Sequence, residues 1–280
     1  MKNKIYPCLW CDGTGKQAAE LYKEAFPNTT ITADNGMVVM EDIDGSQIMM
    51  LNGGSMFKPN ASISLFTVFD KEEELDKAWS KLSDGGQVFM PLNKYPWSEK
   101  YGWIQDKFGI AWQLMLTKPE MKEQRVITAL MFTKAMAGKA EEAIQFYTSL
   151  FPNSTVKDLS RYEKGEGDVE GTIKHGRFVL CDQLMVAMDS SAPHAFSFDE
   201  GMSIVVSCDT QEEIDKYWNA MTTDGGQESM CGWLKDKYGV SWQIVPSMLG
   251  KLMSDPVKGK RAMDALMKMK KLIIADLENA

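Results

Sequence analysis

The amino-acid sequence repeats itself in order, and this duplication restricts the possible folds more than any other feature. Three segments return in sequence: FPNTTI (26–31) as FPNSTV (151–156), DGGQ (84–87) at 224–227, and GWIQDKFGIAWQLM (102–115) as GWLKDKYGVSWQIV (232–245). Self-similarity at a fixed spacing indicates that one structural unit is used more than once. We therefore predict two tandem domains, a first copy at residues 1–118 and a second copy at residues 124–247.

Hydrophobic periodicity divides each copy into two similar halves. In the first half, KIYPCLWC (4–11) has the pattern of a strand, and GKQAAELYKEAF (15–26) has apolar residues at helical spacing. The order restarts with the strand ISLFTVF (63–69) and the helix KEEELDKAWSKL (71–82). Three shorter strands follow each helix, with glycine and asparagine at the turns. The predicted class is α+β, with two βαβββ modules in each domain forming a cupped mixed sheet.

The tail after the second copy has a different pattern. Asp255-Pro256 is a typical helix start, and the apolar residues that follow fall mostly on one side of a helix. We predict a C-terminal helix over residues 255–278. It either packs on the body of the protein as a brace or binds a partner.

Charge and cysteine content exclude several classes of protein. The net charge is −8, whereas a nucleic-acid surface needs a basic footprint, so we expect no nucleic-acid partner. No apolar run approaches the roughly 20 residues of a membrane span, and the first residues lack the pattern of a signal peptide. Five scattered cysteines favour a reduced, cytoplasmic protein over a disulfide framework.

Cys8 and Cys11 have the spacing of thiol oxidoreductases and of half-sites for zinc, but their context is wrong. Residues i and i+3 of a strand point to opposite faces and lie about 10 Å apart along the chain. A disulfide requires the two α-carbons to lie within about 7 Å. The second copy places Leu130 and Thr133 at the equivalent positions. We therefore interpret the cysteine pair as structural.

The duplicated module, with CDG (11–13) before the first helix and YPWSEKYGWIQDKFGIAWQL (95–114) late in the domain, resembles a known superfamily. This is the glyoxalase/bleomycin-resistance/dioxygenase, or vicinal oxygen chelate, superfamily, and the resemblance is closest to its PhnB-like branch. The resemblance covers essentially the whole chain. It implies a cup formed by two modules. The branch has carried a ubiquinone-pathway methyltransferase label, but we find no glycine-rich S-adenosylmethionine loop.

The resemblance also identifies where metal-dependent members place their ligands. Those positions carry, in this sequence, Ile5, Ser64, Gln113 and Met50 in the first copy and Ile127, Ser203, Gln243 and Met188 in the second. Isoleucine and methionine cannot replace histidine and carboxylate as ligands for zinc, nickel or iron. The two histidines, His175 and His194, are expected in a turn and a loop at the surface. We therefore expect no metal site and no cofactor.

The residues left at the cup suggest a binding site. Either these residues satisfy strand-end backbone groups, or they are the few polar contacts of an apolar pocket. Between DGGQ and GW, the first copy carries fourteen residues, VFMPLNKYPWSEKY, where the second copy has only ESMC. This insertion forms an aromatic lid or packs against the other domain. The candidate ligand-binding residues are Ser64, Gln113, Trp97, Tyr101, Trp103, Ser203 and Gln243.

Three functional hypotheses follow. The first is a metal-free protein that binds a small apolar or aromatic molecule, chiefly in the first domain. The second is an isomerase, lyase or transferase with Glu41, Asp42 or Glu99 as its base, or with a non-standard metal set. The third is a duplication in which the second domain replaces the partner subunit of a single-domain dimer. Because the fused pair already buries that surface, we expect a monomer or a weak homodimer.

Overall fold

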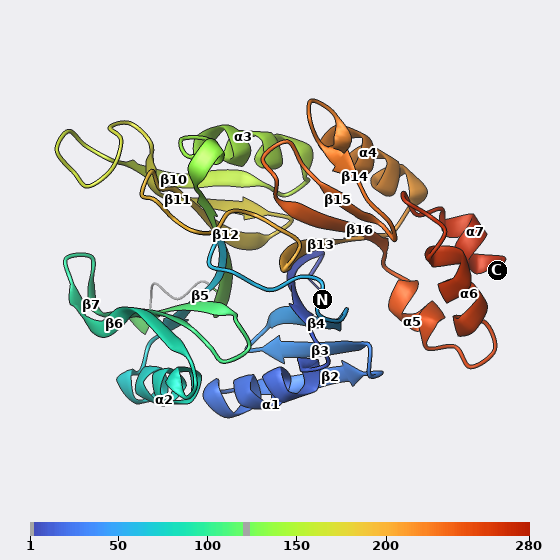
Figure 1. Ribbon diagram of the computed structural model, residues 1–280, viewed down its shortest axis with the longest axis horizontal. Coiled ribbons are helices and arrows are strands. Elements are labelled where there is room, and N and C mark those ends of the chain that lie inside the picture. The colour runs from blue at the N-terminus through green and yellow to red at the C-terminus, as the bar shows by residue number, and fades with distance from the viewer. Residues whose placement is uncertain (1–2, 120–123) are drawn as a thin grey trace. The chain divides into compact units, whose positions relative to one another are not determined.

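The computed structural model describes residues 3–119 and 124–280 (Figure 1). These residues form two compact units, one of Pro7–Met202 with Asn3 and one of Ser203–Ala280 with Lys4–Tyr6. The units differ from the two sequence copies, because the boundary falls inside the second copy. No helix formed by the described residues is long and apolar enough to cross a membrane.

Each copy contains two modules with the predicted order of one strand, one helix and three strands. The first module comprises β1 (Ile5–Cys11), α1 (Gly15–Ala25), β2 (Thr29–Asp34), β3 (Val38–Ile43) and β4 (Ser46–Asn52). The second module comprises β5 (Ile63–Phe69), α2 (Glu72–Ser83), β6 (Gln87–Tyr95), β7 (Ser98–Gln105) and β8 (Ala111–Leu116).

The second copy repeats this order. The third module comprises β9 (Val126–Phe132), a 3-10 turn (Lys134–Met136), α3 (Ala140–Leu150), β10 (Thr155–Arg161), β11 (Ile173–Leu180) and β12 (Gln183–Asp189). The fourth comprises β13 (Met202–Cys208), α4 (Gln211–Thr222), β14 (Gln227–Glu228), β15 (Trp233–Lys235) and β16 (Ser241–Pro246). The predicted α+β class is confirmed.

One eight-stranded mixed sheet lies wholly within the first unit, in the order β10-β11-β12-β9-β5-β8-β7-β6. Its two halves are the second and third modules, joined where β5 and β9 pair antiparallel, with Ser64 opposite Ala129. The expectation that each copy closes its own sheet is therefore wrong, because this sheet combines the end of one copy with the start of the next. Every residue of β5 and of β9 is buried, which marks both strands as central but does not reveal their partners.

The remaining strands form four-stranded groups. In the first unit, the first module pairs in the order β1-β4-β3-β2. In the second unit, the fourth module pairs in the order β14-β15-β16-β13.

Helices cover one face of the eight-stranded sheet. Leu75, Ala78 and Leu82 of α2 are buried, and α2 contacts β5, β7 and β8. Figure 1 shows α3 lying along β10 and β11 at the other end of the same sheet. Trp112 of β8 is fully buried and packs on Tyr22 of α1 and on Phe26 just after it, with ring centroids 4.8 and 4.9 Å apart. The alternate residues of β8, including Gln113, therefore point to the face away from the helices.

The predicted single helix over residues 255–278 is instead two short helices, α6 (Gly259–Leu266) and α7 (Ile274–Glu278), and a further short helix, α5 (Leu249–Met253), precedes them. Between α6 and α7 the chain is not helical, and it bonds to the two residues just before β15. Here the N–H groups of Cys231 and Gly232 donate to the carbonyls of Met269 and Lys270, at 2.7 and 2.8 Å. A continuous helix would use those carbonyls internally.

Candidate functional site

Three predicted residues on neighbouring strands form a buried hydrogen-bonded chain. The Tyr101 hydroxyl on β7 donates to Oε1 of Gln113 on β8 at 2.7 Å. Nε2 of Gln113 donates to Oγ of Ser64 on β5 at 2.8 Å. The three residues are 6%, 4% and 3% exposed, and burial raises the pKa of the Tyr101 phenol. We call Ser64, Gln113 and Tyr101 the polar triad.

A tight turn fixes the position of Gln113. The Asp106 carboxylate accepts the backbone N–H groups of Phe108 and Ile110 at 2.8 and 3.0 Å, and Nε1 of Trp112 at 2.9 Å. The turn passes through Gly109 at φ +88°, a conformation that suits glycine. The segment DKFGIAWQ thus anchors the start of β8, and Gln113 faces away from the helix layer.

Trp103 extends the polar triad with an unused hydrogen-bond donor. It lies directly opposite Gln113 in the β7–β8 pair, so both side chains share a face. Its indole N–H is buried and finds no acceptor among the described residues. A buried unpaired donor costs about 1–3 kcal/mol unless a partner arrives.

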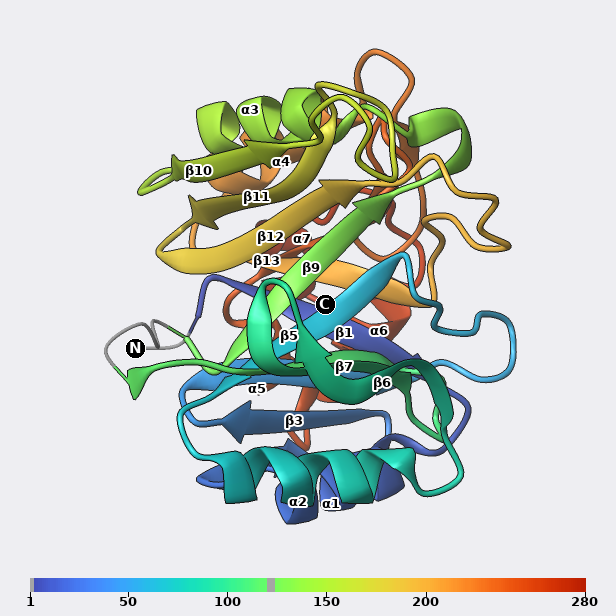
Figure 2. The ribbon, with the colours of Figure 1, turned by 90° about the vertical axis from the view of Figure 1, so that its left-hand side faces the viewer.

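Apolar side chains from both modules surround this polar group. The cluster contains Phe66, Val68, Tyr101, Ile127, Ala129, Leu184 and Val186, with Met90, Tyr95, Trp103, Met115, Val179 and Met188 packed against it. We call this face of the eight-stranded sheet the cup. Residues of β5 and β9 provide its floor, and Figure 2 shows these two strands side by side with the β6–β7 hairpin in front of them.

His175 shows that the cup is curved, and it corrects a prediction. His175 lies within strand β11, not in a turn, because the loop preceding this strand ends at Thr172. Its ring meets the ring of Phe66 edge-on at 6.4 Å, although two strands separate β11 from β5. Burial lowers the pKa of the imidazole. His194 does lie in a loop, as predicted, 2.8 Å from Ser190 Oγ.

The hairpin insertion of the first copy carries an aromatic cluster. Tyr95 and Trp97 stack with ring centroids 5.0 Å apart, and Tyr101 meets both edge-on at 5.7 and 5.8 Å. Tyr95 also packs against the apolar cluster of the cup, whereas Trp97 remains 59% exposed. The hairpin therefore connects the cup to solvent through three aromatic rings.

The other two candidate residues, Ser203 and Gln243, lie in the second unit and repeat part of the triad. Nε2 of Gln243 donates to Oγ of Ser203 at 2.9 Å, and both residues are buried. Tyr101 has no counterpart, because Cys231 occupies its position before the repeated Gly-Trp pair. The seven predicted residues thus form two separate groups, five around the cup and two in the second unit.

The residues of the cup do not fit a divalent metal. Of the positions that the resemblance identifies, four lie on the cup: Ser64, Gln113, Ile127 and Met188. Ser64 and Gln113 are hydrogen-bonded to each other, and the other two side chains are apolar. Within residues 3–119 and 124–280, no three His, Cys, Asp or Glu side chains come together as a ligand set.

The three carboxylates considered as catalytic bases lie away from the cup. Glu41 is fully buried, with neither oxygen hydrogen-bonded to a described residue, and burial raises its pKa to about 8. It shares its face of β3 with Val39 and Ile43, in the first module. Asp42 accepts the N–H of Gly45 in a turn, and Glu99 pairs with Lys94 in solvent.

Cys8 and Cys11 lie in β1, as expected, and none of the five cysteines, all within the described residues, forms a disulfide. Burial raises the pKa of the Cys11 thiol to about 11, which opposes thiolate chemistry.

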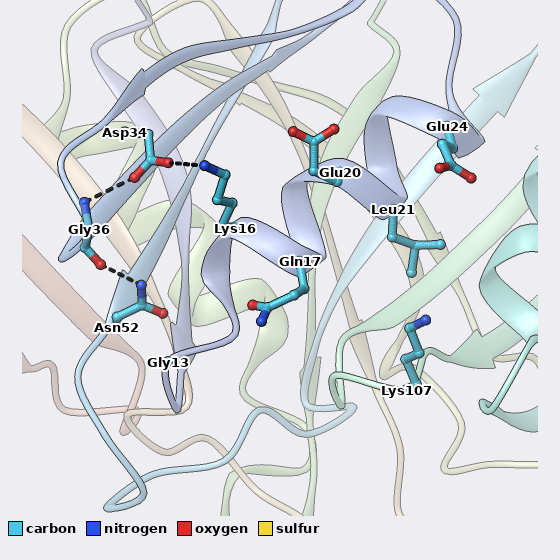
Figure 3. Close-up of a pocket in the computed structure, with 10 residues that line it drawn as sticks. All are labelled: Gly13, Lys16, Gln17, Glu20, Leu21, Glu24, Asp34, Gly36, Asn52 and Lys107. Carbon is cyan, nitrogen blue, oxygen red and sulfur yellow. Dashed lines mark hydrogen bonds and ion pairs between the residues drawn. The ribbon is translucent and has the colours of Figure 1, made fainter.

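A groove of about 750 Å³ lies beside α1, and sequence reasoning did not identify it (Figure 3). At one end, Lys16 pairs with Asp34 at 3.4 Å, and Asn52 donates to the carbonyl of Gly36 at 2.6 Å. Glu20, Glu24 and Lys107 line the remainder. Its surface has mixed charge, and the polar groups at this end already bind one another.

Comparison with known proteins places this architecture in a family. The family model described as 3-demethylubiquinone-9 3-methyltransferase matches residues 3–115 and again residues 124–245. A PhnB protein of Bacillus cereus, also described as a 3-demethylubiquinone-9 3-methyltransferase, is 30% identical. That match covers 41% of this chain and 99% of that chain, with a TM-score of 0.39.

Two further relatives extend the comparison. Protein YjdN of Escherichia coli is 33% identical over 98 residues, which are 34% of this chain and 62% of that protein. Glyoxalase I from Zea mays is 12% identical but covers 89% of this chain and 93% of its own, with a TM-score of 0.60, so it shares the fold. The chain therefore belongs to the 3-demethylubiquinone-9 3-methyltransferase family, with two copies of the family domain in tandem.

Proposed function

We propose that this protein binds a small apolar or aromatic molecule, without a metal, in the cup of the first unit. An aromatic hairpin lies beside an apolar floor that contains the polar triad, and this combination is the main support for the proposal. Binding sites for small molecules have this composition, with a few placed polar groups in a largely apolar lining. The hairpin residues 88–101 act as the lid.

The exposure of Trp97 supports a lid. An exposed tryptophan that stacks on Tyr95 leaves a large apolar surface in water, at 59% exposure, although the cup lies directly behind Tyr95. Loops that bind ligands commonly carry such groups on a rigid scaffold. A ligand entering beneath the hairpin would remove part of this surface from water.

Catalysis by this superfamily is the alternative, and the family description names a methyl transfer. A catalytic base has to reach the substrate within about 3 Å or through one water. Glu41 is buried within the first module, Asp42 of β3 binds the backbone of the following turn, and Glu99 is in a surface ion pair. The eight-stranded sheet is mixed, and the sequence has no glycine-rich loop of the kind that binds a nucleotide, so we favour binding over methyl transfer.

The second unit supports a structural role for its half of the duplication. Val245, on the same face of β16 as Gln243, packs into a cluster built on Leu266, Leu272 and Leu277 of the C-terminal segment. Met253, Met263 and Met269 fill the same cluster. This part of the face is covered by the protein's own chain, and we place ligand binding in the first unit alone.

The test uses methionine methyl groups as site-specific reporters. In protein labelled with ¹³C-methyl methionine, a panel of single-ring aromatic fragments should shift Met90, Met115 and Met188 saturably. The exposed Met56 and Met267 should not respond. Replacing residues 88–101 with the ESMC of the second copy should weaken binding, followed at Met115 and Met188, about tenfold or more, because it removes the three hairpin rings.

The matched control is a Val257→Ala variant, at an exposed residue of the C-terminal segment, which should bind as the wild type does. Fragments that shift only methionines of the C-terminal cluster, or no methionine at all, would show that the cup is not a binding site.

A further inference from the structure

We propose that the cup selects a ring compound carrying an oxygen acceptor, either a carbonyl or a carboxylate, and that Trp103 is the donor that anchors it. This inference rests on the proposed binding function and specifies its ligand. It follows from an imbalance between donors and acceptors at the floor of the cup.

The polar triad has more donor hydrogens than it uses. Serine and tyrosine each carry one donor hydrogen and a glutamine amide carries two, which makes four in the triad. The two internal hydrogen bonds consume two of them. Rotating the Gln113 amide exchanges its oxygen and nitrogen and reverses both hydrogen bonds, but two of the four hydrogens still remain unused. Either arrangement presents donors to a ligand.

Trp103 adds a donor that can do nothing else. Indole nitrogen donates but does not accept, and this N–H is buried without a partner among the described residues. It faces the cup beside Gln113, and its ring packs on Phe89 with centroids 5.0 Å apart. The ring is therefore held in place, and an oxygen acceptor on the ligand would satisfy its N–H.

The charged residues of β10 and β11, at the other side of the cup from Trp103, disfavour a cationic ligand. On β11, burial favours neutral His175, and Arg177 bears a positive charge. Asp158, opposite Arg177 in the β10–β11 pair, is bound to that guanidinium at 3.3 Å. A ligand cation would have to compete with Arg177 for this carboxylate. A ligand carboxylate would compete with Asp158 for the guanidinium, but unlike a cation it could also accept from the unused donors of the floor.

Four probes of one size separate these chemistries, with dissociation constants read from the methyl signals of Met115 and Met188. Acetophenone and benzoate carry oxygen acceptors, ethylbenzene carries none, and benzylamine is a cation at neutral pH. We expect acetophenone and benzoate to bind about fivefold or more tighter than ethylbenzene, and benzylamine to bind weakest. Tighter binding of benzoate than acetophenone would identify a carboxylate ligand, and the reverse a neutral carbonyl.

Trp103→Phe keeps an aromatic ring but removes the N–H. It should weaken acetophenone binding about fivefold to tenfold and change ethylbenzene binding less than about twofold. Trp233→Phe, at the equivalent position of the second copy, is the matched control and should change neither. Because the readout is methyl NMR, loss of tryptophan does not affect it, and preserved methyl dispersion verifies folding.

The outcomes separate the inference from the function it rests on. Equal binding of ethylbenzene and acetophenone, or equal losses for both in Trp103→Phe, would overturn the acceptor proposal while leaving the cup a binding site. Failure of all four probes to shift the cup methionines would overturn both.

Discussion

The second and fourth modules descend from one sequence pattern, yet their exposed edges have diverged. Both bury a hydrogen-bonded pair of glutamine and serine, Gln113 with Ser64 and Gln243 with Ser203. Both also precede the last strand with the same aspartate-anchored turn. The aspartate, Asp106 or Asp236, binds the indole N–H of a tryptophan at 2.9 Å in each case. The shared features are therefore those that hold the last strand in place.

The differences lie beside this shared frame. In the second module a fourteen-residue hairpin segment supplies Tyr95, Trp97 and Tyr101, whereas the fourth module has four residues there. The chain after β16 packs on the fourth module instead. Leu272 lies so close to Gly232 that a Cβ at this glycine would be 3.1 Å from it. One module has gained a partly exposed aromatic edge and the other has been covered by its own C-terminal segment. The two modules thus share the frame that holds the last strand and differ in what lies beside it.

The largest expected effect tests whether the frame is truly shared. Asp106→Ala leaves Trp112 Nε1 and the Tyr22 hydroxyl, which donates to Asp106 at 2.8 Å, without their acceptor. Asp236→Ala removes the acceptor of Trp242 in the same way. We expect each to lower the free energy of unfolding by about 3–5 kcal/mol, measured by urea denaturation. A loss below about 1 kcal/mol at either site would mean that the two turns are not equivalent anchors.

A second test concerns the first and third modules, where one buried position differs in chemistry. Glu41 stands four residues before Gly45, and its counterpart by strand order is the fully buried Phe178. The pKa of Glu41 is raised from 4.5 to about 8, first because of burial and then because of nearby Glu20. Below pH 4.5 the carboxyl is neutral in both the folded and the unfolded chain. As the pH rises toward 8, the unfolded chain loses this proton before the folded one, so stability falls.

Glu41→Gln should remove this pH dependence. Between pH 5 and pH 8 we expect the free energy of unfolding of the wild type to fall by on the order of 3 kcal/mol relative to the variant. The measurement is urea denaturation at each pH, in which the shift in midpoint is multiplied by the dependence of the unfolding free energy on urea concentration. Glu20→Gln is the control for the nearby exposed charge and should keep most of the slope. Parallel pH profiles for wild type and Glu41→Gln would contradict the burial of an ionisable, unpaired carboxyl.

The smallest expected change in unfolding free energy concerns Tyr101, which the first copy has and the second copy lacks. Tyr101→Phe deletes the hydroxyl that donates to Gln113 but keeps the ring stacked against Tyr95 and Trp97. We expect a loss of about 1 kcal/mol in unfolding free energy and a broader Gln113 side-chain amide signal by NMR. Tyr95→Phe, whose hydroxyl donates to the Pro91 carbonyl at the surface, is the matched control and should cost less. An equal cost would mean that the triad bond adds nothing beyond an exposed one.

Several features could be read from the sequence because they depend on local pattern. The order of strand, helix and three strands followed from period-2 and helical spacing, and the strand position of Cys8 and Cys11 followed from the same alternation. The choice of Ser64 and Gln113 as candidate binding residues came from a resemblance, and the structure adds that Gln113 Nε2 donates to Ser64 Oγ at 2.8 Å. The placement of His175 failed, because the long glycine-rich loop before it hid the start of β11.

The sequence by itself determined the number of modules, the class of fold and the absence of a metal-ligand set at the resembling positions, since each depends on residue identity or local periodicity. The tertiary structure alone decided that β5 pairs with β9, and therefore that Phe66 and His175 from different copies face one another. A fully buried strand has apolar side chains on both faces, so its pattern is compatible with any central neighbour. The unpaired N–H of Trp103 was hidden for the same reason, because only the packed neighbours show whether a donor has found an acceptor.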